Sequence, residues 1–319
     1  KKNRVITNLI TKNYDLYPQV KRKNLLQFFL YFYDKKLGSI NKSNITNIDF
    51  YEKKNSIVKT KYSIDKKGSR TNNKFKNKNI ISSYGDSITF CRHVNDNQTW
   101  QYYLSEFTKS NVKNFGVGNY GLDQAFLRLK KQIKKDDKSK IILLGVCPET
   151  IRRNLSLWKH FFEFGNIFNF KPRYAKDRFN NKTILETNPI KSFNDYNNLK
   201  KVINEIKKKD YFYEKKFKQY LWGSPYIISF LKNPKKKAFV FFYCFFKMLE
   251  INYKIKIFKK SKSSFSKDVD LLGGLYLDFQ DKLRMFKDNN ILQTTINIIK
   301  KIKILAKKNN RKIILIIFP

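Results

Sequence analysis

The sequence predicts a doubly wound α/β fold, in which helices cover both faces of a parallel sheet. Strand-like apolar segments at 79–84, 112–115 and 140–146 alternate with amphipathic segments, and 140–146 is apolar almost throughout. A continuous apolar strand is typical of a sheet that is buried on both faces. Strand, helix and strand in succession predict parallel pairing through crossover helices. In such sheets ligands bind beyond the carboxyl ends of the strands, so we expect the functional site there.

The helices follow from apolar residues that recur every three or four positions. This spacing predicts one helix over 99–108, between the first two strands, and another over 122–135, between the second and third. Near the end, 291–308 predicts a long helix and 312–318 another buried strand. Glycines follow the first two predicted strands, at Gly85 and at Gly116, Gly118 and Gly121.

These segments predict an α/β domain over 76–319, preceded by an N-terminal lead-in segment over 1–75. From about 155 to 290 the strand–helix rhythm breaks, and we interpret this as a helical insertion at about 190–290. Within it, 238–251 is apolar almost all round, which predicts a buried helix. The alternative is an interfacial helix on an anionic membrane surface, with Lys235–Lys237 on the phosphates.

The composition is strongly basic, with 68 Lys and Arg against 25 Asp and Glu and a formal charge of +43. Only 11 of the basic residues are Arg, the side chain that suits bidentate phosphate recognition. The lysines are spread along the chain, which favours codon drift in an AT-rich genome as their cause. The charge attracts polyanions in general, but the sequence has no recognisable nucleic-acid module, so no specific nucleic-acid partner is expected.

The three cysteines, Cys91, Cys147 and Cys244, are far apart and form no C-x-x-C pair. They exclude a disulfide framework and a zinc site, and we expect neither a metal nor a cofactor. No apolar run reaches the ~18–20 residues of a membrane-spanning helix. No signal peptide is recognisable, and the pattern leaves a cytoplasmic location open beside a membrane-associated or periplasmic one after removal of a signal.

The strongest local pattern is Gly85-Asp86-Ser87, directly after the first predicted strand. A serine at this point can direct its hydroxyl into the crevice above the sheet, and the neighbouring backbone amides are free to bind an oxyanion. An ordinary turn is the alternative. The next strands end in 114–121 (NFGVGNYG) and 144–149 (LGVCPE), so small and polar residues follow three successive strands.

Together these segments resemble the SGNH (GDSL-type) hydrolase family, on G-D-S-I-T-F at 85–90 and N-F-G-V-G-N-Y-G at 114–121. A further resemblance is to a branch of that family found in bacterial surface-glycan gene sets, over roughly 60–190 and the last thirty residues. It rests on Y-x-I-D-x-x-G-x-R at 62–70, V-N-D-x-x-T-W at 94–100, G-L-D-Q-A at 121–125, P-E-x-I-x-R-N at 148–154 and K-P-R-Y at 171–174. The resemblance implies a flavodoxin-like three-layer sandwich. It also implies an ester hydrolase or O-acyltransferase that acts on acylated carbohydrate or another small acyl ester.

By that resemblance Ser87 is the nucleophile and carries the acyl group as an acyl-enzyme. The oxyanion would be held by three groups. These are the amide of Ser87, an amide of the segment 114–121 at Gly118 or Asn119, and an Asn side chain from the loop after the third predicted strand. Asn119 stands where the family has Gly, and Asn tolerates left-handed φ better than most residues. The position at which the family has this Asn aligns with Cys147, and the nearest Asn on the same loop is Asn154. The supporting residues are Gly85, Asp86 and Gly116.

The catalytic base departs from the family pattern. The family takes its His from a D-x-x-H near the carboxyl end, whereas the two histidines here, His93 and His160, belong to no such motif. One hypothesis is that the base and a last helix follow Pro319, which makes the protein an enzyme. The other is a catalytically degenerate SGNH-like protein that binds acylated glycan. We expect His93, six residues after Ser87, at the surface or on substrate.

Overall fold

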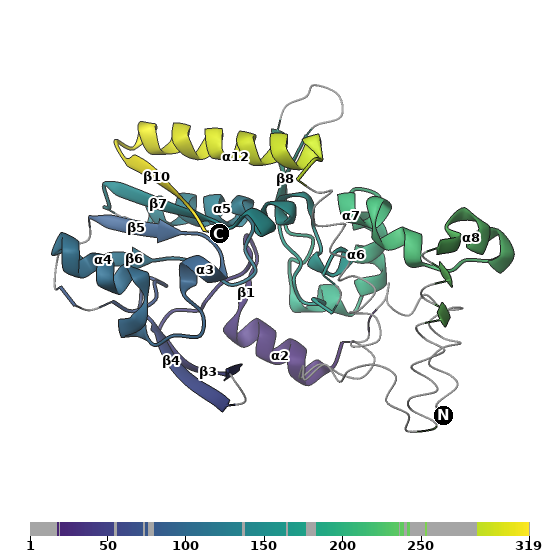
Figure 1. The fold of residues 1–319 in the computed structure, drawn as a ribbon, viewed down its shortest axis with the longest axis horizontal. Coiled ribbons are helices and arrows are strands. Elements are labelled where there is room, and N and C mark those ends of the chain that lie inside the picture. The colour runs from purple at the N-terminus through teal and green to yellow at the C-terminus, as the bar shows by residue number, and fades with distance from the viewer. Residues whose placement is uncertain are drawn as a thin grey trace. The chain divides into compact units, whose positions relative to one another are not determined.

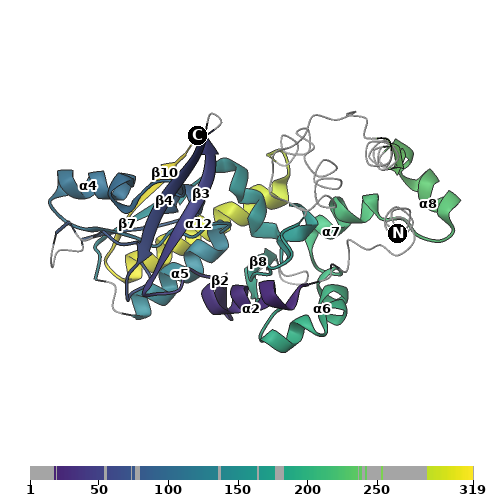
Figure 2. The same ribbon diagram turned by 90° about the horizontal axis from the view of Figure 1, so that it is seen from below.

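The protein is described here by a computed structural model, which covers residues 18, 20–53, 56–72, 74–75, 80–135, 138–163, 165–176, 183–235, 237–238, 241–242, 253 and 286–318. The chain divides into two compact units (Figures 1 and 2). The sheet unit comprises the described parts of 26–155, 171–188 and 284–319, and the helical unit those of 1–25, 156–170 and 189–283.

The core of the sheet unit is a four-stranded parallel sheet, which confirms the predicted α/β class. Its strands are β5 (Ile81–Tyr84), β6 (Val112–Asn114), β7 (Ile141–Val146) and β10 (Lys312–Ile317), in the order β10-β7-β5-β6. The first strand therefore lies between the second and the third, as in doubly wound sheets of the flavodoxin-like order. The chain leaves β5 toward β6 and returns across the sheet to β7, so the topological switch point lies between β5 and β7.

Helices cover both faces of this sheet. Side chains alternate between the two faces along β7, so neighbouring residues of β7 pack against different helices. Ile142 and Leu144 pack into a buried cluster with α5 (Leu122–Lys134) and α12 (Asn289–Lys308). Leu143 belongs to a cluster on the opposite face, where Trp100 and Leu104 of α4 (Trp100–Thr108) cover the sheet. Figure 1 shows α12 and α4 on opposite sides of the strands. The sheet unit is therefore a three-layer arrangement.

The helices and strands predicted for this core are confirmed within a few residues at each end. Their boundaries have local causes: Thr99 caps α4 by accepting a hydrogen bond from the Tyr102 amide, and Asp288 caps α12 through the Asn290 amide. A left-handed residue, Lys109, ends α4. Short 3-10 helices and a strand pair complete the unit: η1 (Asp96–Gln98), η2 (Pro148–Leu155), β8 (Arg173–Lys176) and β9 (Thr183–Glu186).

The segment predicted as a lead-in contributes structure to the sheet unit from residue 26 onward. It contains α2 (Arg22–Tyr31), the short pair β1 (Tyr33–Asp34) and β2 (Gly38–Ser39), and a long antiparallel hairpin of β3 (Ile45–Lys53) and β4 (Ser56–Ile64). Arg70 forms backbone bridges to both Ile64 and Asn114, which join the hairpin to the end of β6. The enrichment of 45–64 in Ile, Val, Thr, Phe and Tyr was a signal for these strands that the sequence analysis above did not use.

The predicted insertion at about 190–290 lies largely in the helical unit, which also takes in 156–170. Its described elements are η3 (Lys159–Phe161), η4 (Phe193–Tyr196), α6 (Leu199–Ile206), α7 (Tyr211–Lys215), η5 (Phe217–Tyr220) and α8 (Tyr226–Lys232). Trp158 lies at its centre, stacked on Phe170 with ring centroids 4.9 Å apart. Most of the predicted helix over 238–251 lies outside the described residues. Within those residues, no helix is long and apolar enough to cross a membrane.

The packing of α12 on the sheet gives a stability prediction. Ile298 is fully buried, whereas Ile304, six residues later on the same helix, is 68% exposed. We expect Ile298→Ala to lower the free energy of unfolding by about 2–4 kcal/mol, because it leaves a cavity between α12 and the sheet. Ile304→Ala is the control and should change it by less than about 0.5 kcal/mol. Equal losses in urea unfolding of the two variants would contradict this placement of the helix.

Candidate functional site

Ser87 is the first residue of the four-residue helix α3 (Ser87–Phe90), which follows directly after β5. Asp86 is the N-cap, and its Oδ1 accepts hydrogen bonds from the amides of Ile88 (2.9 Å) and Thr89 (3.4 Å). The other carboxylate oxygen, Oδ2, is buried and has no hydrogen-bond partner among the described residues. Ser87 itself is partly exposed. Asp86 therefore braces the turn that presents Ser87 at the carboxyl edge of the sheet.

Glycines at the ends of three strands let α3 lie directly on the sheet edge. A Cβ at Gly85 would lie 2.7 Å from the Gly145 carbonyl oxygen and would collide with the Thr89 hydroxyl. A Cβ at Gly145 would collide with the same hydroxyl, and one at Gly116 would lie 2.5 Å from the Phe90 amide nitrogen. A side chain at Gly116 would collide with the backbone of α3, whereas one at Gly85 or Gly145 would displace the Thr89 side chain.

The loop after β6 lies beside Ser87. The Val117 amide donates a hydrogen bond to the Gly85 carbonyl (3.1 Å), which ties the two predicted oxyanion-binding blocks together. Gly118 follows, and a Cβ there would meet no atom within 4 Å. Asn119 adopts φ of 69°, the left-handed conformation that its amide side chain makes accessible. The amide groups of Ser87 and Gly118 donate to no acceptor among the described residues.

A small pocket opens at the switch point between β5 and β7. Gly85, Asp86, Tyr120, Gly121 and Gly145 line it together with residues of α5 and η2. Its volume is about 10 Å³, room for about one water molecule. The pocket thus lies at the carboxyl ends of the strands, where a doubly wound fold places ligands.

A buried arginine holds the other end of α3. The Arg70 guanidinium donates to the carbonyl oxygens of Phe90 (2.9 Å), Cys91 (2.7 Å) and Val94 (2.5 Å), and its Nε pairs with Asp96 at 2.8 Å. The first two carbonyls belong to Phe90, the last residue of α3, and to its C-cap Cys91, where a cation is electrostatically favourable. The sequence motifs at 62–70 and 94–100 thus meet at the helix that carries Ser87.

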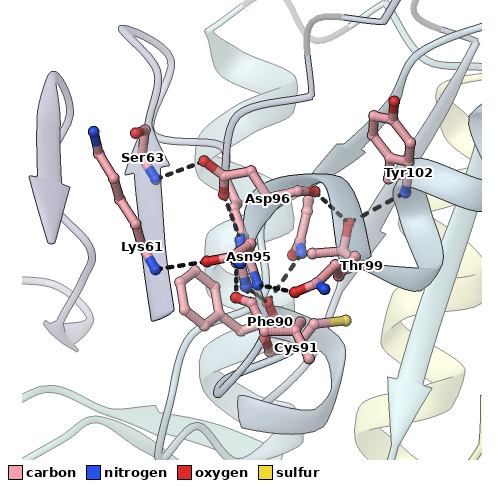
Figure 3. Close-up of polar contacts among 12 residues, drawn as sticks. Lys61, Ser63, Phe90, Cys91, Asn95, Asp96, Thr99 and Tyr102 are labelled. Atoms are coloured by element: carbon pink, nitrogen blue, oxygen red, sulfur yellow. Dashed lines mark hydrogen bonds and ion pairs between the residues drawn. The ribbon is translucent and has the colours of Figure 1, made fainter. Parts of the chain in front are cut away.

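Asp96 and Asn95 in turn fasten this loop to β4 (Figure 3). Asp96 Oδ2 accepts from the Ser63 amide at 3.0 Å, and Asn95 Oδ1 accepts from the Lys61 amide at 2.9 Å. Burial raises the pKa of the Asp96 carboxyl, and the hydrogen bond from Arg70 opposes that shift. The arrangement is a rigid support for α3.

The remaining motifs gather around a second buried ion pair, between Asp123 and Lys171. Lys171 Nζ also donates to the Arg153 carbonyl at 2.9 Å. Burial raises the pKa of Asp123, and the Lys171 charge opposes that shift. The motifs at 121–125, 148–154 and 171–174 are therefore joined by one buried network.

Asn154 is part of this network. Its Oδ1 accepts from the Asp123 amide (3.3 Å), and its Nδ2 donates to Thr295 Oγ1 (3.1 Å). The side-chain amide that the resemblance assigns to the oxyanion hole is thus engaged with α12. Its role as an oxyanion donor stays a prediction, and it requires this amide to leave Thr295.

Neither histidine is hydrogen-bonded to Ser87. His93 lies exposed after α3 with φ of 72°, at the surface as expected. His160 is buried in the helical unit, stacked on Trp158 with ring centroids 4.5 Å apart, and its Nδ1 accepts from the Gly165 amide. Among the described residues no His, Asp or Glu side chain contacts the Ser87 hydroxyl through a hydrogen bond.

The described residues form no group of His, Cys, Asp or Glu side chains that fits a metal ion. Burial raises the pKa of the Cys91 thiol, and Cys147 is buried, so neither is poised as a thiolate nucleophile. The sequence patterns include Arg70 and Lys171 only as members of motifs and do not predict their buried partners. The available signal was the basic residue in each motif, Arg70 in Y-x-I-D-x-x-G-x-R and Lys171 in K-P-R-Y.

Comparison with protein-family models, with curated proteins and with solved structures found no match for this chain. The candidate site at Ser87, its amide and the Gly118 loop is therefore supported by the geometry of the structure alone.

The close packing of α3 gives a second prediction. We expect Gly145→Ala to lower the free energy of unfolding by about 1–3 kcal/mol, because the new methyl group displaces the Thr89 hydroxyl. That hydroxyl is buried without a hydrogen-bond partner among the described residues, so Thr89→Ala should cost less and should recover part of the loss in the double variant. Urea unfolding of all four proteins measures the coupling. Gly118→Ala, whose methyl meets no atom, is the control. Purely additive losses would contradict the packing.

Proposed function

We propose that this chain is an ester hydrolase or O-acyltransferase of the SGNH (GDSL) type that acts on acylated carbohydrate, with Ser87 as its nucleophile. One observation carries the proposal: Ser87 lies at the carboxyl edge of the sheet, where the hydrogen bond from Val117 to Gly85 joins its turn to the Gly118 loop, and the amides of Ser87 and Gly118 have no acceptor among the described residues. Open amide groups beside a nucleophile are what stabilises the oxyanion of acyl transfer.

In the proposed reaction, Ser87 Oγ attacks the carbonyl carbon of the ester and the open amides bind the resulting oxyanion. The bond between that carbon and the sugar oxygen then breaks, and the proton lost by Ser87 passes to the sugar oxygen by way of a general base. Water or a second sugar hydroxyl attacks the acyl-enzyme, releases the acyl group and restores the Ser87 proton. The braces at Asp86 and Arg70 support this chemistry because they hold the donors in place before substrate binds.

The alternative function is binding of an acylated glycan without turnover. It is favoured by the lack of a general base on Ser87 among the described residues. The two functions differ in whether Ser87 becomes covalently modified, and this difference can be measured directly.

We expect a fluorophosphonate to modify the 319-residue chain at Ser87, detected by peptide mass spectrometry. Ser87→Ala should lower the labelling rate by more than about a thousandfold, as removal of a triad member does. Added imidazole should raise the rate in the unsubstituted protein, because it can accept the Ser87 proton, and should leave Ser87→Ala unaffected.

Ser43→Ala, at an exposed serine in the loop before β3, is the matched control and should label normally. Labelling that persists in Ser87→Ala would refute Ser87 as the nucleophile. A chain that binds an O-acetylated oligosaccharide but is never labelled, even with imidazole, would establish the binding function instead.

A further inference from the structure

Helix α8 (Tyr226–Lys232) of the helical unit has no buried residue. Ile227 is 76% exposed and Leu231 67%, and their spacing of four residues puts both on one face of the helix. Ile228 and Tyr226 are exposed beside them, and so are Phe241 and Phe242 farther along the chain. Six large apolar side chains exposed within so short a stretch are unusual for a protein surface and indicate a binding function.

Contacts with Lys237 and Trp222 hold α8 in place. Lys237 Nζ donates hydrogen bonds to the carbonyl and the hydroxyl of Ser229, and lies 5.7 Å from the centre of the Trp222 ring. Trp222 contacts Phe230 of α8, with ring centroids 6.1 Å apart. These contacts hold α8, while Ile227 and Leu231 stay exposed.

The charge around these side chains has one sign. Lys232 and Lys235 are exposed at the carboxyl end of α8, and the sequence contains no Asp or Glu from 215 to 249. Two copies of such a surface would bring lysines against lysines, and a nucleic acid would leave the isoleucine and leucine side chains unburied. An anionic lipid surface matches both features, because its acyl boundary takes the apolar side chains and its phosphates take the ammonium groups.

We propose that α8, with Phe241, Phe242, Lys232 and Lys235, is a membrane-binding surface that lies in the headgroup region of anionic bilayers. The inference goes beyond the proposed function and does not depend on it. It concerns association with one leaflet.

The test is flotation of the full chain with phosphatidylcholine vesicles, with and without phosphatidylglycerol, at about 0.1 M and about 0.5 M salt. We expect binding only with phosphatidylglycerol, and part of it should resist the higher salt because apolar burial is not screened. Ile227→Ser combined with Leu231→Ser should weaken binding about tenfold or more and remove the salt-resistant part. Lys232→Gln combined with Lys235→Gln should weaken binding at low salt.

Matched controls lie in the sheet unit. Phe107→Ser with Ile304→Ser removes two equally exposed apolar side chains, and Lys303→Gln with Lys307→Gln removes two exposed charges of α12. Both should bind vesicles as the unsubstituted protein does. All these side chains are exposed, and circular dichroism verifies that each variant is folded. Equal losses in the control and α8 variants would overturn the proposal, since the overall charge would then be the cause. Self-association that depends on Ile227 and Leu231, without vesicle binding, would also overturn it.

Discussion

The close contact between α3 and the ends of three strands is the constraint on which the rest of the site depends. Gly85, Gly116 and Gly145 lack side chains at the points where Thr89 and Phe90 approach the sheet. This contact sets the direction of α3 and so the position of Ser87 at its first residue. It also brings the Gly85 carbonyl within reach of the Val117 amide, which aligns the loop that carries Gly118. A larger residue at Gly116 would collide with the α3 backbone itself, and one at Gly85 or Gly145 with the Thr89 side chain.

Two buried charged networks extend this constraint through the sheet unit. Arg70 fastens the carboxyl end of α3, the following loop and the β3–β4 hairpin, whereas the Asp123–Lys171 pair joins α5, η2 and the segment before β8. Buried ion pairs stabilise little by themselves, but removal of one partner leaves a buried charge and costs about 3–5 kcal/mol. Most charged residues of the recognised motifs thus position the backbone. The proposed chemistry falls to Ser87 and to backbone amides.

The proposed activity and the proposed membrane surface lie in different units and have different physical origins. The first depends on open hydrogen-bond donors at a rigid edge, and the second on apolar side chains that no part of the described chain covers. The distribution of lysines bears on both. The lysines are spread along the sequence, which favours codon drift as their cause. Around α8, however, the lysines have no acidic neighbours in the sequence and lie near exposed apolar side chains. A polybasic segment of this kind contributes to membrane binding only together with apolar anchors.

By itself the sequence determined the strands and helices of the parallel sheet and the place of Ser87 after β5, because these depend on local periodicity and on turn residues. It did not reveal the β3–β4 hairpin as part of the sheet unit, nor the partners of Arg70, which lie 20 to 26 positions away. The engagement of Asn154 with Thr295, 141 positions on, was equally beyond a local pattern. The exposure of α8 was also decided by the tertiary structure, since the sequence pattern of an apolar segment is the same whether the segment is buried or exposed. Periodicity reports which face of an element is apolar, but only the assembled chain determines what that face meets.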